Sequence, residues 1–175
     1  MLPDNCYAVV MAGGAGTRLW PLSNSTVPKH FLRLFDGRSL IELTVDRLDG
    51  LIPDDRIIIL TSVKYQAIAQ QTLPQIPPEN FVYEPCLRDT ASAIGLAATV
   101  LKTRCSTATM VMLTADQIIE PAAQFNAAVA NAAAFLELHP DQLVAFGVEA
   151  ASPLSLIHIS EPTRLLVQSR MPSSA

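Results

Sequence analysis

The chain has 175 residues, half of them hydrophobic and 16% charged, and its formal net charge is −4 at pH 7. This length suits one domain, and this composition excludes an intrinsically disordered chain. The acidic balance argues against a general nucleic-acid-binding protein, so any anion-binding site has to be local.

The three cysteines, Cys6, Cys86 and Cys105, are odd in number and lack metal-ligand spacing, which is typical of reduced thiols. The N-terminus has no basic region, and its apolar run is too short for a signal peptide or a membrane span. We therefore expect a cytoplasmic protein with neither a membrane nor a nucleic acid as partner.

Segments typical of strands and of helices alternate along most of the chain. Apolar runs of strand length predict strands at residues 8–11, 56–61, 80–84, 108–114 and 143–147. Helices are expected from Ser39 to about Gly50, at residues 64–71, from Asp89, and from Pro121 to about His139. This alternation predicts an α/β fold, with a mostly parallel sheet flanked by helices and right-handed crossovers.

The helices have recognisable ends and apolar faces. Ser39 and Glu42 have the spacing of a capping box, and Asp89 is expected to cap the third helix. Pro121 is expected in the first turn of the last helix. The residues predicted to face the core are Ile41, Val45 and Leu48 in the first helix, Ile94, Ala97, Ala98 and Leu101 in the third, and Phe125, Val129, Ala132 and Leu136 in the last.

The loops that follow three of the predicted strands carry polar or glycine-rich sequence. They begin after Met11, at Glu84-Pro85 and at Ala115-Asp116. Ligands of parallel sheets gather beyond the carboxyl ends of the strands. We therefore expect these three loops to form one site.

The first of these loops contains Gly13, Gly14 and Gly16, and the cations Arg18 and Lys29 follow it. Glycines allow backbone N–H groups to point into one concavity, which suits a polyphosphate, and the two cations would add positive charge there. The alternative is a turn-forming glycine cluster with two solvated cations. The spacing matches neither a dinucleotide-binding G-x-G-x-x-G nor a Walker loop.

The full string GGAGTRLWPLS at residues 13–23, followed by PKHFL at 28–32, resembles the signature of the sugar-1-phosphate nucleotidyltransferases. Within them it is most similar to the mannose-1-phosphate guanylyltransferases, or GDP-mannose pyrophosphorylases. His30 stands where that family usually has Gln. The resemblance implies a Rossmann-like sheet of the nucleotide-diphospho-sugar transferase type, here truncated.

Two later segments also resemble the family. EPCLRDTA at residues 84–91 is similar to its nucleobase segment E-P-x-x-R-N-T-A, with Asp89 for Asn. LTADQII at 113–119 is similar to P-A-D-H-x-I, with Thr114 for Pro and Gln117 for His. Outside the resemblance, Asp89 is a helix cap, Arg88 forms a surface ion pair and Asp116 is more often a cap than a ligand.

The resemblance implies transfer of a guanylyl group from GTP to mannose 1-phosphate, giving GDP-mannose and pyrophosphate. Mg²⁺ is the expected cofactor with Asp116 as its ligand, while Arg18 and Lys29 are the expected catalytic residues. The full-length enzyme is a possible homo-oligomer. The residues expected to bind the nucleotide are Ala12, Gly13, Gly14, Gly16, Thr17, Glu84, Pro85, Arg88, Thr90 and Ala91.

The resemblance extends to FGVEAASP at residues 146–153 and stops there. Residues 154–164, LSLIHISEPTR, match the translation of a transposase-type sequencing adapter, although their alternation alone would predict a strand. We therefore expect residues 1–153 to be the N-terminal part of a nucleotidyltransferase domain and 154–175 to be a non-native tail. On this interpretation the chain is an incomplete, inactive fragment without the sugar-phosphate lysine and the second metal-binding Asp of the family.

Two other functions are compatible with these residues. One is a related sugar-1-phosphate nucleotidyltransferase that uses another sugar or base. The other is a non-catalytic module that senses nucleotide sugars. A molybdopterin-type guanylyltransferase would place its lysine much sooner after the glycines. Mg²⁺-dependent release of pyrophosphate separates catalysis from sensing.

Overall fold

The structure is a computed structural model that describes residues 1–14, 21–23, 27–86 and 89–147. The chain divides into two compact units, Met1–Gln142 and Leu143–Ala175. The architecture that follows is that of the first unit. Within the described ranges, no helix combines the length and the apolar character needed to cross a membrane.

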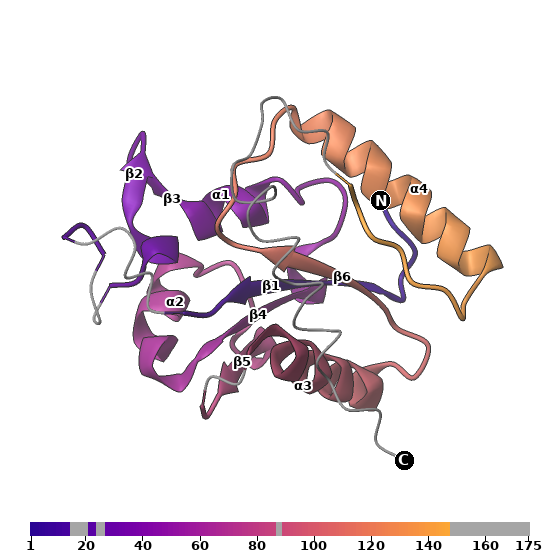
Figure 1. Cartoon of the computed structure of the whole chain (residues 1–175), viewed down its shortest axis with the longest axis horizontal. Helices are drawn as coiled ribbons and strands as arrows, with labels where there is room; N and C mark the ends of the chain where they lie inside the picture. The colour runs from indigo at the N-terminus through magenta and orange to yellow at the C-terminus, as the bar shows by residue number, and fades with distance from the viewer. Residues whose placement is uncertain (15–20, 24–26, 87–88, 148–175) are drawn as a thin grey trace, which may run out of the picture. The chain divides into compact units, whose positions relative to one another are not determined.

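The first unit contains strands and helices in alternation (Figure 1). The strands are β1 (Cys6–Ala12), β2 (Arg33–Phe35), β3 (Arg38–Ser39), β4 (Ile57–Ser62), β5 (Phe81–Glu84) and β6 (Thr109–Thr114). The α-helices are α1 (Leu40–Asp46), α2 (Gln66–Thr72), α3 (Asp89–Arg104) and α4 (Ala122–Leu138). Short 3-10 helices are η2 (Lys29–Phe31), η3 (Asp54–Arg56), η4 (Val63–Tyr65) and η5 (Pro78–Asn80).

Four strands form a parallel sheet in the order β5-β4-β1-β6, which confirms the predicted α/β fold. The central strand β1 pairs Val10 with Ile59 of β4 on one side and with Leu113 of β6 on the other. β2 and β3 form a separate antiparallel hairpin. Because all four strands of the large sheet run the same way, the loops after β1, β5 and β6 lie at one edge of it.

The residues of β1 alternate between two hydrophobic cores, as expected for a strand covered on both faces. Ala8, Val10 and Ala12 belong to the larger core, to which α1, α2 and α4 contribute. Val9 belongs to the smaller core, which α3 covers. Figure 1 shows α3 on one side of the sheet and α1 and α4 on the other.

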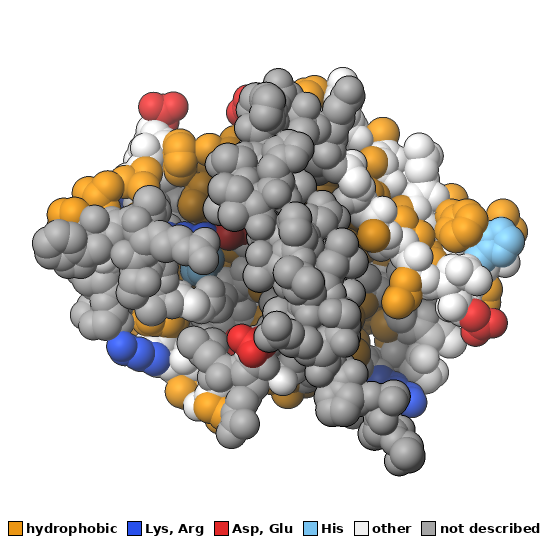
Figure 2. Space-filling model, in the orientation of Figure 1, with side chains coloured by type: hydrophobic (Ala, Val, Ile, Leu, Met, Phe, Trp, Pro, Cys, Tyr) orange, Lys and Arg blue, Asp and Glu red, His pale blue; other side chains and the backbone are white. Residues whose placement is uncertain are grey.

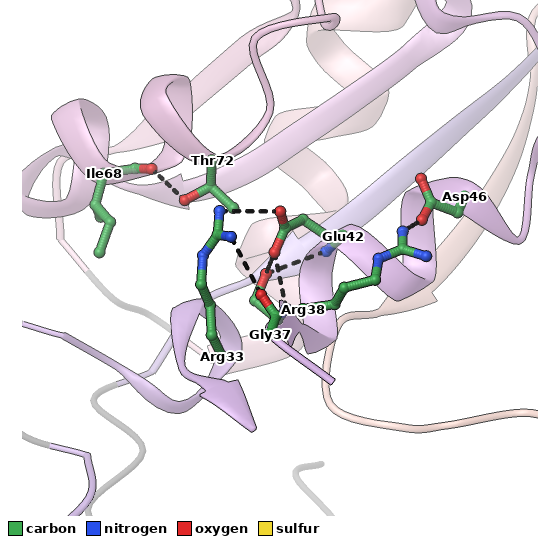
Figure 3. A network of polar contacts seen from close by, with 8 residues as sticks. Arg33, Gly37, Arg38, Glu42, Asp46, Ile68 and Thr72 are labelled. Carbon is green, nitrogen blue, oxygen red and sulfur yellow. Dashed lines mark hydrogen bonds and ion pairs between the residues drawn. The ribbon is translucent and has the colours of Figure 1, made fainter. Parts of the chain in front are cut away.

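The predicted capping box at the start of α1 is confirmed. The Glu42 N–H donates to the Ser39 hydroxyl, and the Ser39 N–H donates to the Glu42 carboxylate over 2.7 Å. Arg33 of the hairpin also donates to Glu42, and Arg38 forms an ion pair with Asp46 (Figure 3). Burial would raise the pKa of Glu42, but the Ser39 hydrogen bonds and the two arginines outweigh burial and lower that pKa.

The other helices differ from prediction in detail. In α3 the buried residues are Ala93, Ala97 and Leu101, which lie four apart, whereas Ala98 is exposed because it lies about 100° further round the helix. In α4 the buried residues are Val129 and Ala133. Phe135 and Leu138 of α4 are exposed. Figure 2 shows hydrophobic side chains at several places on the surface of the molecule. Pro121 precedes α4 as its N-cap residue.

The predicted strand at residues 143–147 is wrong. These residues have no regular secondary structure, and Leu143, Val144 and Phe146 are exposed. An apolar run becomes a strand only when a neighbouring strand completes its hydrogen bonds, and local sequence cannot supply that neighbour. The expected tail at 154–175 lies outside the described residues.

Candidate functional site

A cavity of about 320 Å³ lies at the carboxyl ends of the parallel strands. Residues from the ends of β1, β5 and β6, from η2 and from the start of α3 line it. The structure therefore brings the three predicted loops together in one place. The lining residues are Met11, Gly13, Gly14, His30, Glu84, Asp89, Thr90, Ala93, Thr114 and Asp116.

The glycine loop enters this cavity directly from the central strand. Ala12 is fully buried as the last residue of β1, and its carbonyl accepts a 2.8 Å hydrogen bond from the Thr61 hydroxyl. Gly14 has φ +92°, a conformation that favours glycine, and a Cβ placed there would meet nothing within 4 Å. The predicted residues Gly16, Thr17, Arg18 and Arg88 lie outside the described part of the chain.

The predicted catalytic lysine and the predicted metal ligand contact each other. The Lys29 Nζ donates to Oδ2 of Asp116 over 2.7 Å, across 87 positions of sequence. Burial would raise the pKa of Asp116, but hydrogen bonds from Lys29 and Thr114, together with the charges of Lys29 and His30, lower that pKa. Asp116 is therefore a carboxylate at neutral pH.

His30 lies between the first and the third loop. Its Nε2 lies 2.8 Å from the Gly13 carbonyl oxygen, and its Nδ1 lies 3.2 Å from the Ala115 carbonyl oxygen. The side chain is buried, with 3% of the residue exposed. The sequence predicted no role for His30, although its position beside Lys29 was a usable signal. Thr114, whose hydroxyl helps to lower the pKa of Asp116, was also missed because a threonine in a strand rarely signals a site.

Glu84 ends β5 and lines the cavity on the side of α3. It is 6% exposed, and burial raises the pKa of its carboxyl group. Among the described residues, none forms a hydrogen bond to that carboxyl group. Of the other residues predicted to contact the base, Thr90 lines the cavity, while Pro85 and Ala91 each directly follow a lining residue in the chain.

The oxygen ligands in the cavity fit a metal ion that is also coordinated by the phosphates of a bound substrate. Among the described residues, no cluster of three or more His, Cys, Asp and Glu side chains could hold a metal alone. Asp116 is one carboxylate, and Lys29 occupies its Oδ2. Mg²⁺ is commonly held by one or two carboxylates together with substrate phosphates, so Asp116 fits such an ion as a single protein ligand.

The chain is similar in sequence to proteins of one known family. Residues 7–153 match the family model described as nucleotidyl transferase. A mannose-1-phosphate guanylyltransferase of Escherichia coli is 38% identical over 152 residues, and the Xanthan biosynthesis protein XanB of Xanthomonas campestris is 34% identical over 147. These matches cover 85% and 83% of this chain and 31% of each relative, so the chain spans about a third of the length of these curated relatives.

Solved structures show the same fold. One from Thermus thermophilus, named a mannose-1-phosphate geranyltransferase, has a TM-score of 0.67 at 35% identity. The match covers 78% of this chain and 39% of that one. A second, from Helicobacter pylori and named a mannose-6-phosphate isomerase, has a TM-score of 0.64 at 23% identity and so bears on the fold alone; it covers 85% of this chain and 52% of that one. The chain belongs to the nucleotidyl transferase family.

Proposed function

We propose that this chain carries the nucleotide-binding part of a mannose-1-phosphate guanylyltransferase, which transfers a guanylyl group from GTP to mannose 1-phosphate. The observation that carries the proposal is the cavity itself. In it, a glycine loop, a lysine–aspartate pair and a buried glutamate meet at the ends of three parallel strands. The names of the curated relatives support mannose 1-phosphate and the guanylyl group as the reactants.

The glycine loop and the cations form the phosphate end of the proposed site. Backbone N–H groups of residues 13–17 hold the nucleotide phosphates, and Arg18 and Lys29 neutralise their charge. An oxygen of the sugar phosphate attacks the α-phosphorus in line, the bond from that phosphorus to the bridging oxygen breaks, and pyrophosphate leaves. The protein contributes mainly alignment and charge stabilisation to this step.

Asp116 is the proposed protein ligand of Mg²⁺, which supplies charge neutralisation at the phosphates when bound. Lys29 has two anionic partners available in that state, the Asp116 carboxylate and a nucleotide phosphate. Its 2.7 Å bond to Asp116 holds the ammonium group beside the cavity before the nucleotide arrives. The Thr114 hydroxyl also favours the charged form of the same carboxylate and so helps to lower the pKa of Asp116.

Glu84 is the proposed base-recognition residue, with Pro85, Arg88, Thr90 and Ala91 contributing the rest of the surface. Guanine has N–H groups that can donate hydrogen bonds to a carboxylate, whereas adenine has a different pattern of hydrogen-bond donors and acceptors. An unmatched buried polar group costs about 1–3 kcal/mol. A buried Glu84 without a partner among the described residues therefore favours a base that donates to it.

Titration of the 175-residue chain with GTP, ATP, UTP and dTTP in the presence of Mg²⁺ tests this proposal. We expect GTP to bind about tenfold or more tightly than the other three. Failure to bind any nucleotide would overturn the proposal, and equal binding of all four would overturn the assignment of guanine. Arg18→Ala should weaken GTP binding by about 10- to 100-fold, as expected for a charged donor.

A paired assay tests whether the chain completes the reaction. Pyrophosphate release is measured with GTP and either mannose 1-phosphate or glucose 1-phosphate, with Mg²⁺ or with EDTA. We propose binding without turnover for this chain, because it spans 31% of the length of its relatives. Turnover comparable to that of a full-length relative would contradict the proposed incompleteness and would identify the sugar directly.

A further inference from the structure

The turn at residues 115–117, which carries Asp116, is held at both of its flanking carbonyl groups. The Ala115 carbonyl lies within hydrogen-bond distance of His30, and the Gln117 carbonyl accepts a 3.0 Å hydrogen bond from Nη2 of Arg47. The Ala115 N–H donates to the Met11 carbonyl at the end of β1 over 3.0 Å. Three segments from the first 47 residues therefore fix a turn that lies about 70 residues further along the chain.

His30 joins this turn to the glycine loop. Its two ring nitrogens face the carbonyls of Gly13 and Ala115, which can only accept hydrogen bonds. The ring therefore has no nitrogen left for a nucleotide, although it lines the cavity. Its action on a bound ligand has to pass through the two loops that it joins.

Arg47 holds the other side of the turn from the end of α1. It is 7% exposed, its guanidinium lies 5.2 Å from the centre of the Phe125 ring, and burial lowers its pKa. Among the described residues, none with a carboxylate lies within ion-pair distance of it. A buried cation without an anionic partner is unfavourable, and its hydrogen bond to Gln117 is the one polar contact that compensates within the described chain.

We propose that His30 and Arg47 are positioning residues that fix Asp116 relative to the glycine loop, so that its carboxylate lies where nucleotide-bound Mg²⁺ arrives. This inference rests on the proposed function for its ligand. The claim that these two side chains fix the turn at residues 115–117 rests only on their hydrogen bonds to its carbonyl groups. A flexible turn would leave the carboxylate of Asp116 poorly aligned with the nucleotide. Alignment of the reacting groups is a main contribution of a protein to phosphoryl transfer.

The test compares four variants of the full chain. His30→Leu removes both ring nitrogens, and His30→Gln restores an N–H donor and is the residue usual in the resembling family. Arg47→Met keeps an apolar stem beside Phe125 and removes the donor. Arg56→Met is the matched control, because Arg56 also donates to a backbone carbonyl, that of Pro3 over 2.7 Å, but it ends η3 directly before β4 and does not line the cavity.

Two quantities are measured on each folded variant. One is hydrogen exchange in a peptide covering residues 113–119 without ligand, and the other is the ratio of GTP affinities with Mg²⁺ and with EDTA. We expect His30→Leu and Arg47→Met to speed exchange and to lower the Mg²⁺ ratio by about tenfold. His30→Gln should stay within about threefold of wild type, and Arg56→Met should change neither quantity.

Wild-type exchange in both His30→Leu and Arg47→Met would overturn the inference, and so would faster exchange with an unchanged Mg²⁺ ratio. If His30→Leu fails to fold, Arg47→Met and its Arg56 control decide alone. If the wild-type chain does not bind GTP but the variants still exchange faster, the proposed function and the Mg²⁺ role are overturned. The conclusion that His30 and Arg47 fix the turn at residues 115–117 would then remain.

Discussion

Two of the networks of polar and charged side chains within the described residues have partners at very different distances along the chain. The hairpin network consists of Arg33, Arg38, Ser39, Glu42 and Asp46, and its partners lie within nine residues of one another. The site network consists of Lys29, His30, Thr114 and Asp116, and its long-range contacts join positions 85 to 87 residues apart. Figure 3 shows the first network at the start of α1.

This difference separates a structural role from a functional one. The hairpin network forms as soon as α1 and its hairpin form, and it satisfies N–H groups at a helix end. The site network exists only after β1 and β6 pair, and it places a cation and an anion beside a cavity. We therefore expect the first network to affect stability and the second to affect ligand binding.

Asp116→Asn should have the largest effect. Loss of the carboxylate removes the proposed Mg²⁺ ligand, and interactions of charged groups at such sites are worth about 1.5–3 kcal/mol, or about 10- to 100-fold in GTP affinity with Mg²⁺. Asp46→Asn is the matched control, because it also breaks an ion pair with a basic side chain but lies in the hairpin network. Equal effects of the two substitutions on GTP affinity would remove Asp116 from the site.

Lys29→Gln should reduce GTP affinity by about tenfold, because it removes one charge-assisted donor to the phosphates. Lys102→Gln, near the end of α3, serves as the control for the loss of one positive charge. Calorimetric titration at two salt concentrations measures both. Wild-type GTP affinity in Lys29→Gln would show that the lysine does not contact the nucleotide phosphates and pairs with Asp116 alone.

Ser39→Ala should lower the free energy of unfolding by about 1 kcal/mol, the usual cost of losing an N-cap side chain. The substitution removes the hydroxyl that accepts from the Glu42 N–H, and it leaves the cavity residues unchanged. Urea unfolding measures the loss, and GTP titration should show no change. A loss of GTP affinity would show that the two networks are coupled.

The two glutamates with shifted pKa values should respond to pH in opposite directions. The pKa of Glu42 is lowered in the folded chain, so its contribution to stability is present above the unfolded value of about 4.3 and is lost as pH falls through the folded value. The pKa of Glu84 is raised by burial, so its contribution is present below about 4.3 and is lost as pH rises through the folded value.

Urea unfolding of Glu42→Gln and Glu84→Gln at about pH 4 and about pH 7, on either side of the ordinary carboxyl value, checks these signs. The quantity compared is the free energy of unfolding of each variant minus that of wild type at the same pH. For Glu42→Gln this difference should be lower at the higher pH than at the lower pH. For Glu84→Gln it should be higher at the higher pH than at the lower pH. The same sign for both would contradict the assigned environments. The effect of Glu42 is the smaller in free energy because its surroundings are more exposed to solvent.

Sequence patterns predicted the sheet well because its strands are continuous apolar runs and its loops carry a family signature. Local chemistry also predicted the capping box, since Ser39 and Glu42 are three residues apart. Two features could not be predicted, because they depend on which strands are neighbours in the sheet. One is the ion pair between Lys29 and Asp116, and the other is the contact of His30 and Arg47 with the turn at residues 115–117. The failed strand at residues 143–147 has the same cause.

The most direct test of the central claim, that the cavity at the strand ends is the nucleotide site, is a nuclear magnetic resonance titration of the ¹⁵N-labelled chain with GTP and Mg²⁺. We predict that amide shifts concentrate at the cavity residues Gly13, Gly14, Glu84 and Asp116, and that residues 33–46 of the hairpin network stay unchanged. Shifts confined to the hairpin network, or none at the four cavity amides at saturating GTP, would contradict the claim.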